Sequence, residues 1–182
     1  ARDGFTGARD VIEHRHGFAN VFSGAQPGDI GAIEAGIAQP LEILDPGIAF
    51  KIFPSNFHTQ AGVVAVLRMV REEGVRADQV ESVRCLGNHM IQHSLWNADP
   101  KTGLEGKLSV YHSTAAALVD GAGGVKQYTD ARVRSKPVTA LRERVEVVVD
   151  ESLRKEEAHV AVVLRDGSTH ARHVRHATGS RE

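Results

Sequence analysis

Residues 51–73 read KIFPSNFHTQAGVVAVLRMVREE and hold the strongest structural pattern in the chain. From Phe57 onward, apolar residues recur at the three- and four-residue spacing of a helix that buries one face. The apolar positions are Ala61, Val64, Ala65, Leu67, Met69 and Val70, and the polar ones are Arg68, Arg71, Glu72 and Glu73. Gly74 is typical of the residue that ends a helix. The stretch predicts a helix over residues 57–73, with a Phe-Pro turn directly before it.

The remaining elements predict an α+β domain. Residues 158–164 and 169–174 flank Arg165-Asp166-Gly167, and an Asp-Gly pair is a strong hairpin signal. Further strands are predicted at 80–86 and 145–149, a second main helix at 108–121, short helical segments at 4–17, 125–136 and 137–142, and a polar loop at 89–106. Because helices and strands are partly segregated along the chain, we expect a mainly antiparallel sheet of about four strands packed with two main helices.

The first quarter of the chain differs in composition from the rest. Residues 1–44 are predicted to be a junction segment, with a short helix at 4–17 and then a connector rich in Gly, Ala and Pro. One helical turn is expected near residues 30–37. Residues 45–182 are predicted to be the α+β domain. The chain starts with Ala1 instead of methionine and ends without a closing element, so we expect a fragment or a trimmed domain.

Charge and cysteine content exclude several classes of partner. The formal net charge of the 182 residues is −1, so no basic field would draw the chain to nucleic acid or to an anionic membrane. No apolar run approaches the roughly 20 residues that a membrane span needs. Cys85 is the only cysteine, which rules out an intrachain disulfide and suits a reducing compartment. We therefore expect a cytoplasmic protein.

Lys51 and His58 flank the Phe-Pro turn and are the first candidates for a functional site. Partial burial of the Lys51 ammonium among apolar neighbours would strengthen its attraction for a carboxylate. His58 lies in the first helical turn, where the helix dipole disfavours imidazolium and keeps the ring available as a base. The alternative is a lysine that reaches solvent and a histidine that caps the helix or lies in the core.

A second set of candidates stands at the start of the helix predicted over residues 108–121. Tyr111 is a candidate catalytic residue because a phenol hydroxyl can donate to a substrate oxygen or act as an acid. Lys107 and His112 are candidates for substrate binding. The alternative is a half-buried structural tyrosine beside a surface lysine.

Other reactive side chains carry weaker signals. His170, His173 and His176 do not share one strand face, and no Cys or carboxylate joins them at a metal-ligand spacing, so no metal site is predicted. Cys85 lies in the middle of a predicted strand and is expected to be buried. The run GAGG over residues 121–124 ends a helix and is expected to be a turn, not a phosphate-binding loop.

Five segments, taken in order, resemble the MmgE/PrpD family, which includes 2-methylcitrate dehydratases, cis-aconitate decarboxylases and iminodisuccinate epimerases. They are GFTGARDVIEHRHGF, FKIFPSNFHTQAGVVAV, GKLSVYHSTAAALVDG, RVEVVVDESL and VAVVLRDGSTHARHV. The second is similar to the family's Lys…Phe-Pro…His stretch, and the third is similar to its tyrosine-bearing segment. Taken together, the five segments extend over almost the whole chain, in the family's order and spacing.

The resemblance implies a two-domain enzyme in which this α+β part is the lid over a larger helical domain, itself absent from these residues. Carried over by motif, Lys51 would bind a substrate carboxylate, His58 would transfer a proton or bind a carboxylate, and Tyr111 would donate a hydrogen bond. No metal or organic cofactor is implied. The implied partners are a small carboxylate substrate, the helical domain and a second subunit of a homodimer. Without the helical domain we expect weak or no catalysis.

Three reactions of the family share one early step, which is proton abstraction next to a carboxylate. The resemblance favours a 2-methylcitrate dehydratase-like lyase acting on small di- or tricarboxylates, because FHTQ after the Phe-Pro pair is most similar to that branch. An iminodisuccinate epimerase-like or cis-aconitate decarboxylase-like enzyme is the alternative within the family. An inactive fragment or an interaction module is the alternative of another class, and it would expose apolar surface.

Overall fold

The computed structural model describes residues 4, 6–23, 28–37, 41, 43–91 and 97–179. It divides into an N-terminal unit (Ala1–Ile48) and a C-terminal unit (Ala49–Glu182). Part of the predicted loop at 89–106 lies outside the described residues, and this part includes Trp96. Among the described residues, none of the helices is both long and apolar enough to cross a membrane.

The N-terminal unit contains two short helices, α1 (Phe18–Phe22) and α2 (Ile30–Gly36), and a helical turn over Ile43–Gly47. The helical turn expected near residues 30–37 is confirmed as α2, which the Asp29 side chain caps by accepting from the Ala32 N–H at 3.0 Å. Many of the large apolar side chains described in this unit are exposed to solvent.

The helix predicted over residues 4–17 is wrong. The chain turns back there, so that the N–H groups of Phe18 and Ala19 donate to the carbonyls of Val11 and Ile12. Gly17 makes this return possible, because a Cβ at this position would lie 2.6 Å from the Val11 carbonyl oxygen. A short apolar face of two residues is too small to stabilise a helix against this local alternative.

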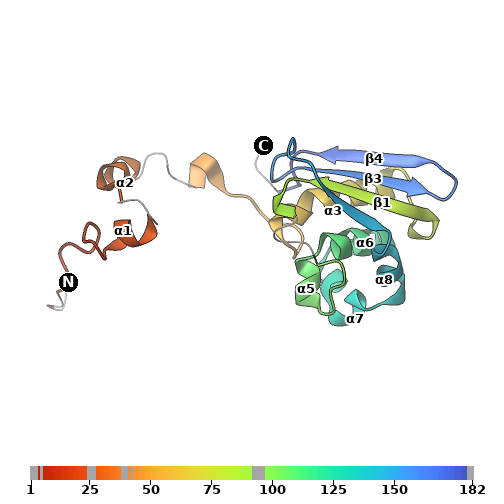
Figure 1. Cartoon of the computed structure of the whole chain (residues 1–182), viewed down its shortest axis with the longest axis horizontal. Coiled ribbons are helices and arrows are strands. Elements are labelled where there is room, and N and C mark those ends of the chain that lie inside the picture. The colour runs from red at the N-terminus through yellow and green to blue at the C-terminus, as the bar shows by residue number, and fades with distance from the viewer. Residues whose placement is uncertain are drawn as a thin grey trace. The chain divides into compact units, whose positions relative to one another are not determined.

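The C-terminal unit is built on a four-stranded sheet with the order β2-β1-β3-β4 (Figure 1). The strands are β1 (Val80–Gly87), β2 (Val145–Val149), β3 (Ala158–Leu164) and β4 (Thr169–Val174). β1 pairs antiparallel with β3, and β3 pairs antiparallel with β4 through the predicted hairpin, whose Gly167 has a φ of 87°. β1 and β2 are parallel, so the sheet is mixed, with antiparallel pairings in the majority.

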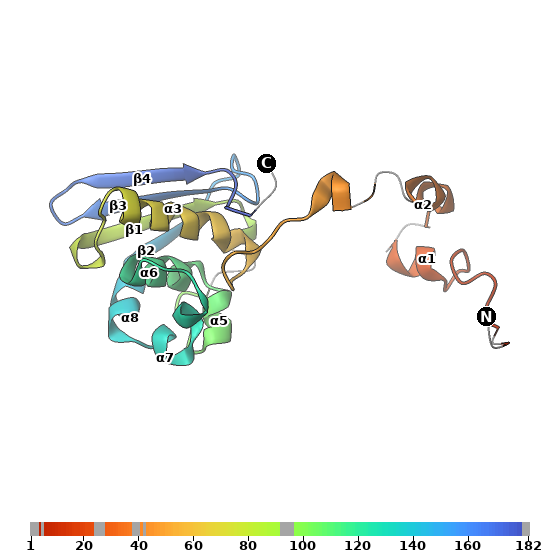
Figure 2. The same cartoon turned by 180° about the vertical axis from the view of Figure 1, so that it is seen from behind.

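Two long helices cover one face of this sheet, and smaller helices gather beside the second of them (Figures 1 and 2). The predicted first helix is a 3-10 turn η2 (Phe57–Thr59) that continues into α3 (Gln60–Glu72). The predicted second helix is α6 (Val110–Asp120), which Gly121 ends in the left-handed conformation. The smaller elements are η3 (Ala77–Gln79), α5 (Gly103–Lys107), η4 (Val125–Tyr128), α7 (Asp130–Val133) and α8 (Lys136–Arg142).

Helix α5 corrects the prediction of an irregular loop that reaches residue 106. Thr102 and Glu105 form a capping box, in which each side chain accepts from the other residue's backbone N–H. This box satisfies two N–H groups that would otherwise lack partners at the start of the helix. The spacing Thr-x-x-Glu was readable in the sequence and would have placed the helix.

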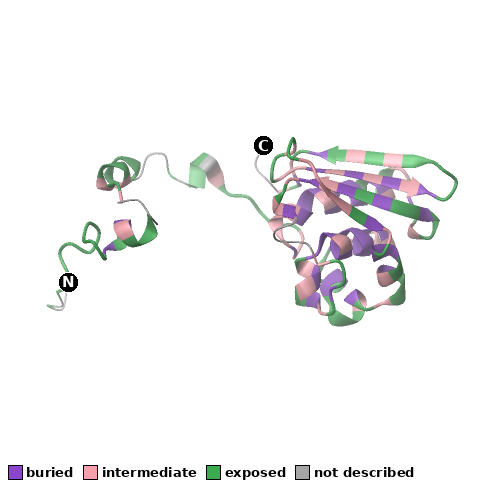
Figure 3. Ribbon diagram, viewed as in Figure 1, coloured by how far each residue is buried: buried purple, intermediate pink, exposed green. Residues whose placement is uncertain are grey.

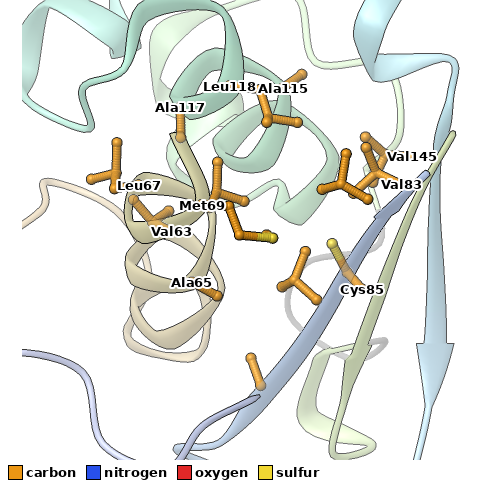
Figure 4. Packing of buried hydrophobic residues seen from close by; sticks show 14 of the residues in the cluster. Val63, Ala65, Leu67, Met69, Val83, Cys85, Ala115, Ala117, Leu118 and Val145 are labelled. Carbon is orange, nitrogen blue, oxygen red and sulfur yellow. The ribbon is translucent and has the colours of Figure 1, made fainter. Parts of the chain in front are cut away.

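The core lies between the sheet and the helices α3 and α6 (Figures 3 and 4). Every second residue of β3 is buried against them, from Ala158 to Leu164. Figure 4 shows Met69 of α3 pointing toward the strand residues Val83 and Cys85. The burial is continuous across both helices and all four strands, which makes the C-terminal unit one packed domain.

A buried glutamine fixes the Phe-Pro turn in front of α3. The Gln60 side chain is 3% exposed, and its Oε1 accepts from the Phe53 N–H at 3.2 Å. Its Nε2 lies 3.1 Å from the Phe53 carbonyl oxygen and 3.2 Å from Ser55 Oγ. One side-chain amide therefore serves as hydrogen-bond partner to both backbone groups of Phe53, in place of a neighbouring strand.

The hydroxyls of Ser55 and Thr59 extend this network. Thr59 Oγ1 donates to the Asn56 carbonyl at 2.8 Å, so Ser55 Oγ is the donor in its 2.7 Å hydrogen bond to Thr59 Oγ1. Both side chains are buried. Because a buried polar network is stable only when its members are satisfied, the turn has one well-defined conformation.

Replacement of Gln60 by leucine should lower the free energy of unfolding by about 2 kcal/mol, because the two backbone groups of Phe53 lose their partner. Urea denaturation followed by circular dichroism measures this change. Gln79→Leu is the matched control, since Gln79 is exposed and the same substitution there should change stability by less than about 0.5 kcal/mol. Equal stability of the two variants would show that Gln60 does not hold the turn.

Candidate functional site

Two of the predicted site residues, Lys51 and Lys107, line one surface depression of about 530 Å³. Its other lining residues are Ile52, Phe53, Pro54, Ser55, Gly124 and Val125. No carboxylate is among them. Within the described part of the chain, neither lysine forms an ion pair. The depression is therefore lined by two lysines and by no acidic residue.

The backbone brings these two lysines together from segments more than fifty residues apart. The Asn56 N–H donates to the Lys107 carbonyl at 2.9 Å, which fastens the end of α5 to the Phe-Pro turn. On the other side, the Phe53 ring packs where Gly123 has no side chain, since a Cβ there would lie 2.8 Å from Cδ1 of the ring. Gly124 and Val125 thereby complete the depression.

His58 lies on η2, beside the same turn, but is not among the residues that line the depression. Asn56 caps this turn by accepting from the His58 N–H at 3.0 Å. The His58 Nδ1 lies 2.8 Å from the carbonyl oxygen of Lys155. A carbonyl only accepts, so Nδ1 carries the proton of the neutral ring and Nε2 keeps a lone pair.

Tyr111 lies in the first turn of α6, half-buried, and packs partly against the core. Among the described residues its hydroxyl has no hydrogen-bond partner, and it does not line the depression. The hydroxyl thus keeps both a donor and an acceptor. The role predicted for Tyr111 stays a prediction.

His112 does not fit the role of substrate binding predicted for it. Its side chain is fully buried, and Nε2 donates to the Gln127 carbonyl at 2.9 Å. The imidazole packs edge to face on Tyr128 and against Gly106, where a Cβ would lie 2.9 Å from the ring. His112 therefore joins α5, α6 and η4 as a structural residue. In this structure the buried ring offers a substrate no accessible surface.

The electrostatics of His112 follow from this burial. Removal of the ring from water lowers its pKa, and the nearby charges of Arg142 and Arg132 lower it further, although the hydrogen bond to Gln127 acts in the opposite direction. Nδ1 is buried without a partner in the described part of the structure. The ring is therefore neutral at pH 7, with its proton on Nε2.

The other reactive side chains are engaged in structural contacts. Cys85 is buried with its Sγ 3.5 Å from Thr114 Oγ1, and burial raises the pKa of the thiol to about 11, so no thiolate nucleophile forms near pH 7. His170 and Arg172 both bind the carboxylate of Glu73, which ties β4 to the end of α3 and lowers the pKa of Glu73. No group of three metal-binding side chains occurs among the described residues.

Exposed apolar side chains occur on the segments that line the depression. In the described part of the C-terminal unit, all large exposed hydrophobic residues belong to the three segments that line it. They are Phe50, Ile52, Leu104, Leu108 and Val125, of which Phe50 and Val125 are each 72% exposed. A concentrated apolar rim of this kind is typical of a surface that another protein surface covers.

The burial of His112 generates a prediction about pH. The pKa of His112 is lower in the folded state than in the unfolded state, where it is about 6.5. As the pH falls below about 6.5, the imidazole of the unfolded state takes up a proton while that of the folded state stays neutral. The free energy of unfolding therefore decreases. His112→Gln removes this titration. The variant should be less stable than the wild type at pH 8, and the difference should shrink between pH 7 and pH 5. Urea denaturation at each pH measures it, and a constant difference would contradict the pKa assignment.

Comparison with known protein families agrees with the α+β fold. Residues 53–182 match the model of the MmgE/PrpD C-terminal domain. No curated protein sequence matches the chain. The family model begins at Phe53, inside the Phe-Pro turn, and extends through the whole sheet. Since the match covers well over half of the residues, the chain belongs to the MmgE/PrpD family, whose members are generally hydro-lyase-type enzymes.

Proposed function

We propose that this domain forms the cationic wall of a cofactor-independent lyase and binds the carboxylates of a small di- or tricarboxylate through Lys51 and Lys107. The observation that carries the proposal is that these two unpaired lysines line one depression. The proposed reaction is dehydration, as in a 2-methylcitrate dehydratase. Membership of the family supports the lyase class, and the substrate is part of the proposal.

The charge arrangement favours a polyanionic substrate. Two ammonium groups with no acidic neighbour in the depression attract a carboxylate most strongly where the surrounding surface is apolar and excludes water. Lys51 is exposed and Lys107 is half-buried, so the depression can receive a ligand without rearrangement of the core. Two separate lysines suit a substrate with more than one carboxylate.

The proposed chemistry is proton abstraction from a carbon next to a carboxylate, followed by departure of the hydroxyl group of the neighbouring carbon, which takes up the abstracted proton and leaves as water. Negative charge develops on the carboxylate during this step, and fixed ammonium groups stabilise it. We assign the proton transfer to His58, whose neutral ring keeps the Nε2 lone pair while the Lys155 carbonyl binds Nδ1. Tyr111 would donate its hydroxyl to a substrate oxygen.

A second protein surface would complete the site. His58 and Tyr111 lie outside the depression, and the segments that line the depression carry the apolar rim defined by Phe50, Ile52, Leu104, Leu108 and Val125. In the proposal, the helical domain of the family covers this rim, encloses the substrate and excludes water from the reacting groups.

The same rim supports a second candidate function, that of an interaction module without catalysis. In that case the apolar side chains would bind a protein partner, and the two lysines would serve only as part of the contact. The two functions differ in whether the depression binds a free carboxylate.

Titration of the 182-residue chain with citrate, followed by calorimetry, tests the proposal. Citrate should bind, and Lys51→Ala and Lys107→Ala should each weaken its affinity by about three- to tenfold, because each removes one charged contact. Lys136→Ala is the matched control, since this exposed lysine on α8 lies outside the depression and its loss changes the net charge equally.

Two outcomes would contradict the proposal. One is the same loss of affinity in Lys136→Ala as in the two site variants, which would show that the loss comes from the change in net charge alone. The other is no binding of citrate by the wild-type chain, which would favour the interaction module.

A further inference from the structure

A second pocket, of about 360 Å³, shares part of its lining with the lysine depression. Its apolar lining comes from Ile52 and Phe53 of that segment and from Val64 and Leu67 of α3. Thr178, Arg68, Arg71 and Glu72 complete the lining. Ile52 and Phe53 also line the lysine depression, so both cavities contact these two residues.

The period of α3 determines how this pocket is built. Positions 64, 67, 68 and 71 lie on one face of a helix, because they are three, four and seven residues apart. Val64 and Leu67 are buried and form an apolar floor, whereas Arg68 and Arg71 are exposed at its rim. One helix thus supplies both the apolar surface and the two guanidinium groups.

The opposite wall is held in place by the backbone. The Phe50 N–H donates to the Gly179 carbonyl at 2.8 Å, which fastens the segment before Ile52 to the chain after Thr178. Gly179 has a φ of 88°, and a Cβ there would lie 2.5 Å from the Phe50 carbonyl oxygen. The approach of the two segments therefore requires glycine, and it shapes the pocket independently of any ligand.

The rim of the pocket carries positive charge that the described residues do not neutralise. Glu72 is bound by Arg172 at 3.0 Å, and the neighbouring Glu73 is bound by Arg172 and His170. Within the described part of the chain, Arg68 and Arg71 form no ion pair. The acidic side chains at this end of α3 are thus directed to β4, and both guanidinium groups remain available.

We propose that this pocket binds a small amphiphilic carboxylate, that is, a single carboxylate attached to a short apolar chain. A guanidinium matches the two oxygens of a carboxylate in a bidentate pair, and Arg68 and Arg71 offer two such groups at one rim. The apolar floor formed by Val64 and Leu67, with Phe53 beside it, would contact the apolar chain of the ligand. The volume lies near the lower end of the range of small-molecule sites, about 300–1,000 Å³, which suits a chain of a few carbons.

This site is separate from the proposed substrate site. The lysine depression is lined by two ammonium groups and favours several carboxylates, whereas the arginine pocket combines one apolar floor with one charged rim. Because Ile52 and Phe53 line both cavities, a ligand in the arginine pocket would contact the segment that carries Lys51. The pocket can bind its ligand whether or not the depression binds citrate.

Hexanoate is a suitable probe, and its binding can be followed by amide chemical shifts of the 15N-labelled 182-residue chain. Hexanoate should produce saturable shifts at Leu67, Arg71 and Thr178. Acetate should bind more weakly because it has no chain to bury, with each buried methylene worth about fourfold in affinity. Hexan-1-ol should also bind more weakly because it has no charge. Equal binding of hexanoate and hexan-1-ol would overturn the proposal, as would the absence of a saturable shift.

A pair of variants separates the pocket from general charge effects. The double variant Arg68→Gln, Arg71→Gln should weaken hexanoate binding about tenfold. The charge-matched control is Arg76→Gln, Arg84→Gln, which removes two exposed arginines that are already paired with Asp78 and Glu146 and do not line the pocket. The control should bind hexanoate as the wild type does. Equal losses in the two double variants would overturn the proposal.

Discussion

The arrangement of the candidate site depends on the hydrogen bonds that the buried Gln60 side chain makes to the Phe-Pro turn. A turn that contains proline cannot pair like a strand, so the half-buried backbone groups of Phe53 need other hydrogen-bond partners. Gln60 supplies both an acceptor and a donor to Phe53 from the first turn of α3. Since α3 is packed in the core, its hydrogen bonds to the turn also fix the position of the residues on either side of the turn. Lys51 precedes the turn and His58 follows it.

The function proposed for the domain follows from what this rigid turn places next to α5. The Asn56–Lys107 hydrogen bond brings a second lysine to the same depression, with no acidic side chain to balance the two charges. Two lysines on one depression with no acidic lining residue give it a local positive charge, which attracts anions. The apolar rim and the membership of the MmgE/PrpD family both agree with one wall of a cleft that closes around a carboxylate substrate.

Much of the fold could be predicted from the sequence, because local patterns determine it. The apolar period fixes α3, alternation fixes the strands, and Asp166-Gly167 fixes the hairpin. The parallel pairing of β1 with β2 could not be predicted, since it depends on a long crossover with no local signal. At the site, the Phe-Pro turn and its two flanking residues could be predicted from the sequence, but the burial of His112 and the role of Gln60 could not. Both depend on which segments pack together far apart in the sequence.

The most direct test of this account is the affinity of the Gln60→Leu variant for citrate, measured by calorimetry at a temperature at which circular dichroism shows the variant to be folded. Gln60 does not line the depression, so its substitution removes no charge and no ligand contact. If Gln60 positions the turn, the variant should bind citrate about three- to tenfold more weakly, as expected for loss of one charged contact. A folded Gln60→Leu variant that binds citrate as tightly as the wild type would contradict the account.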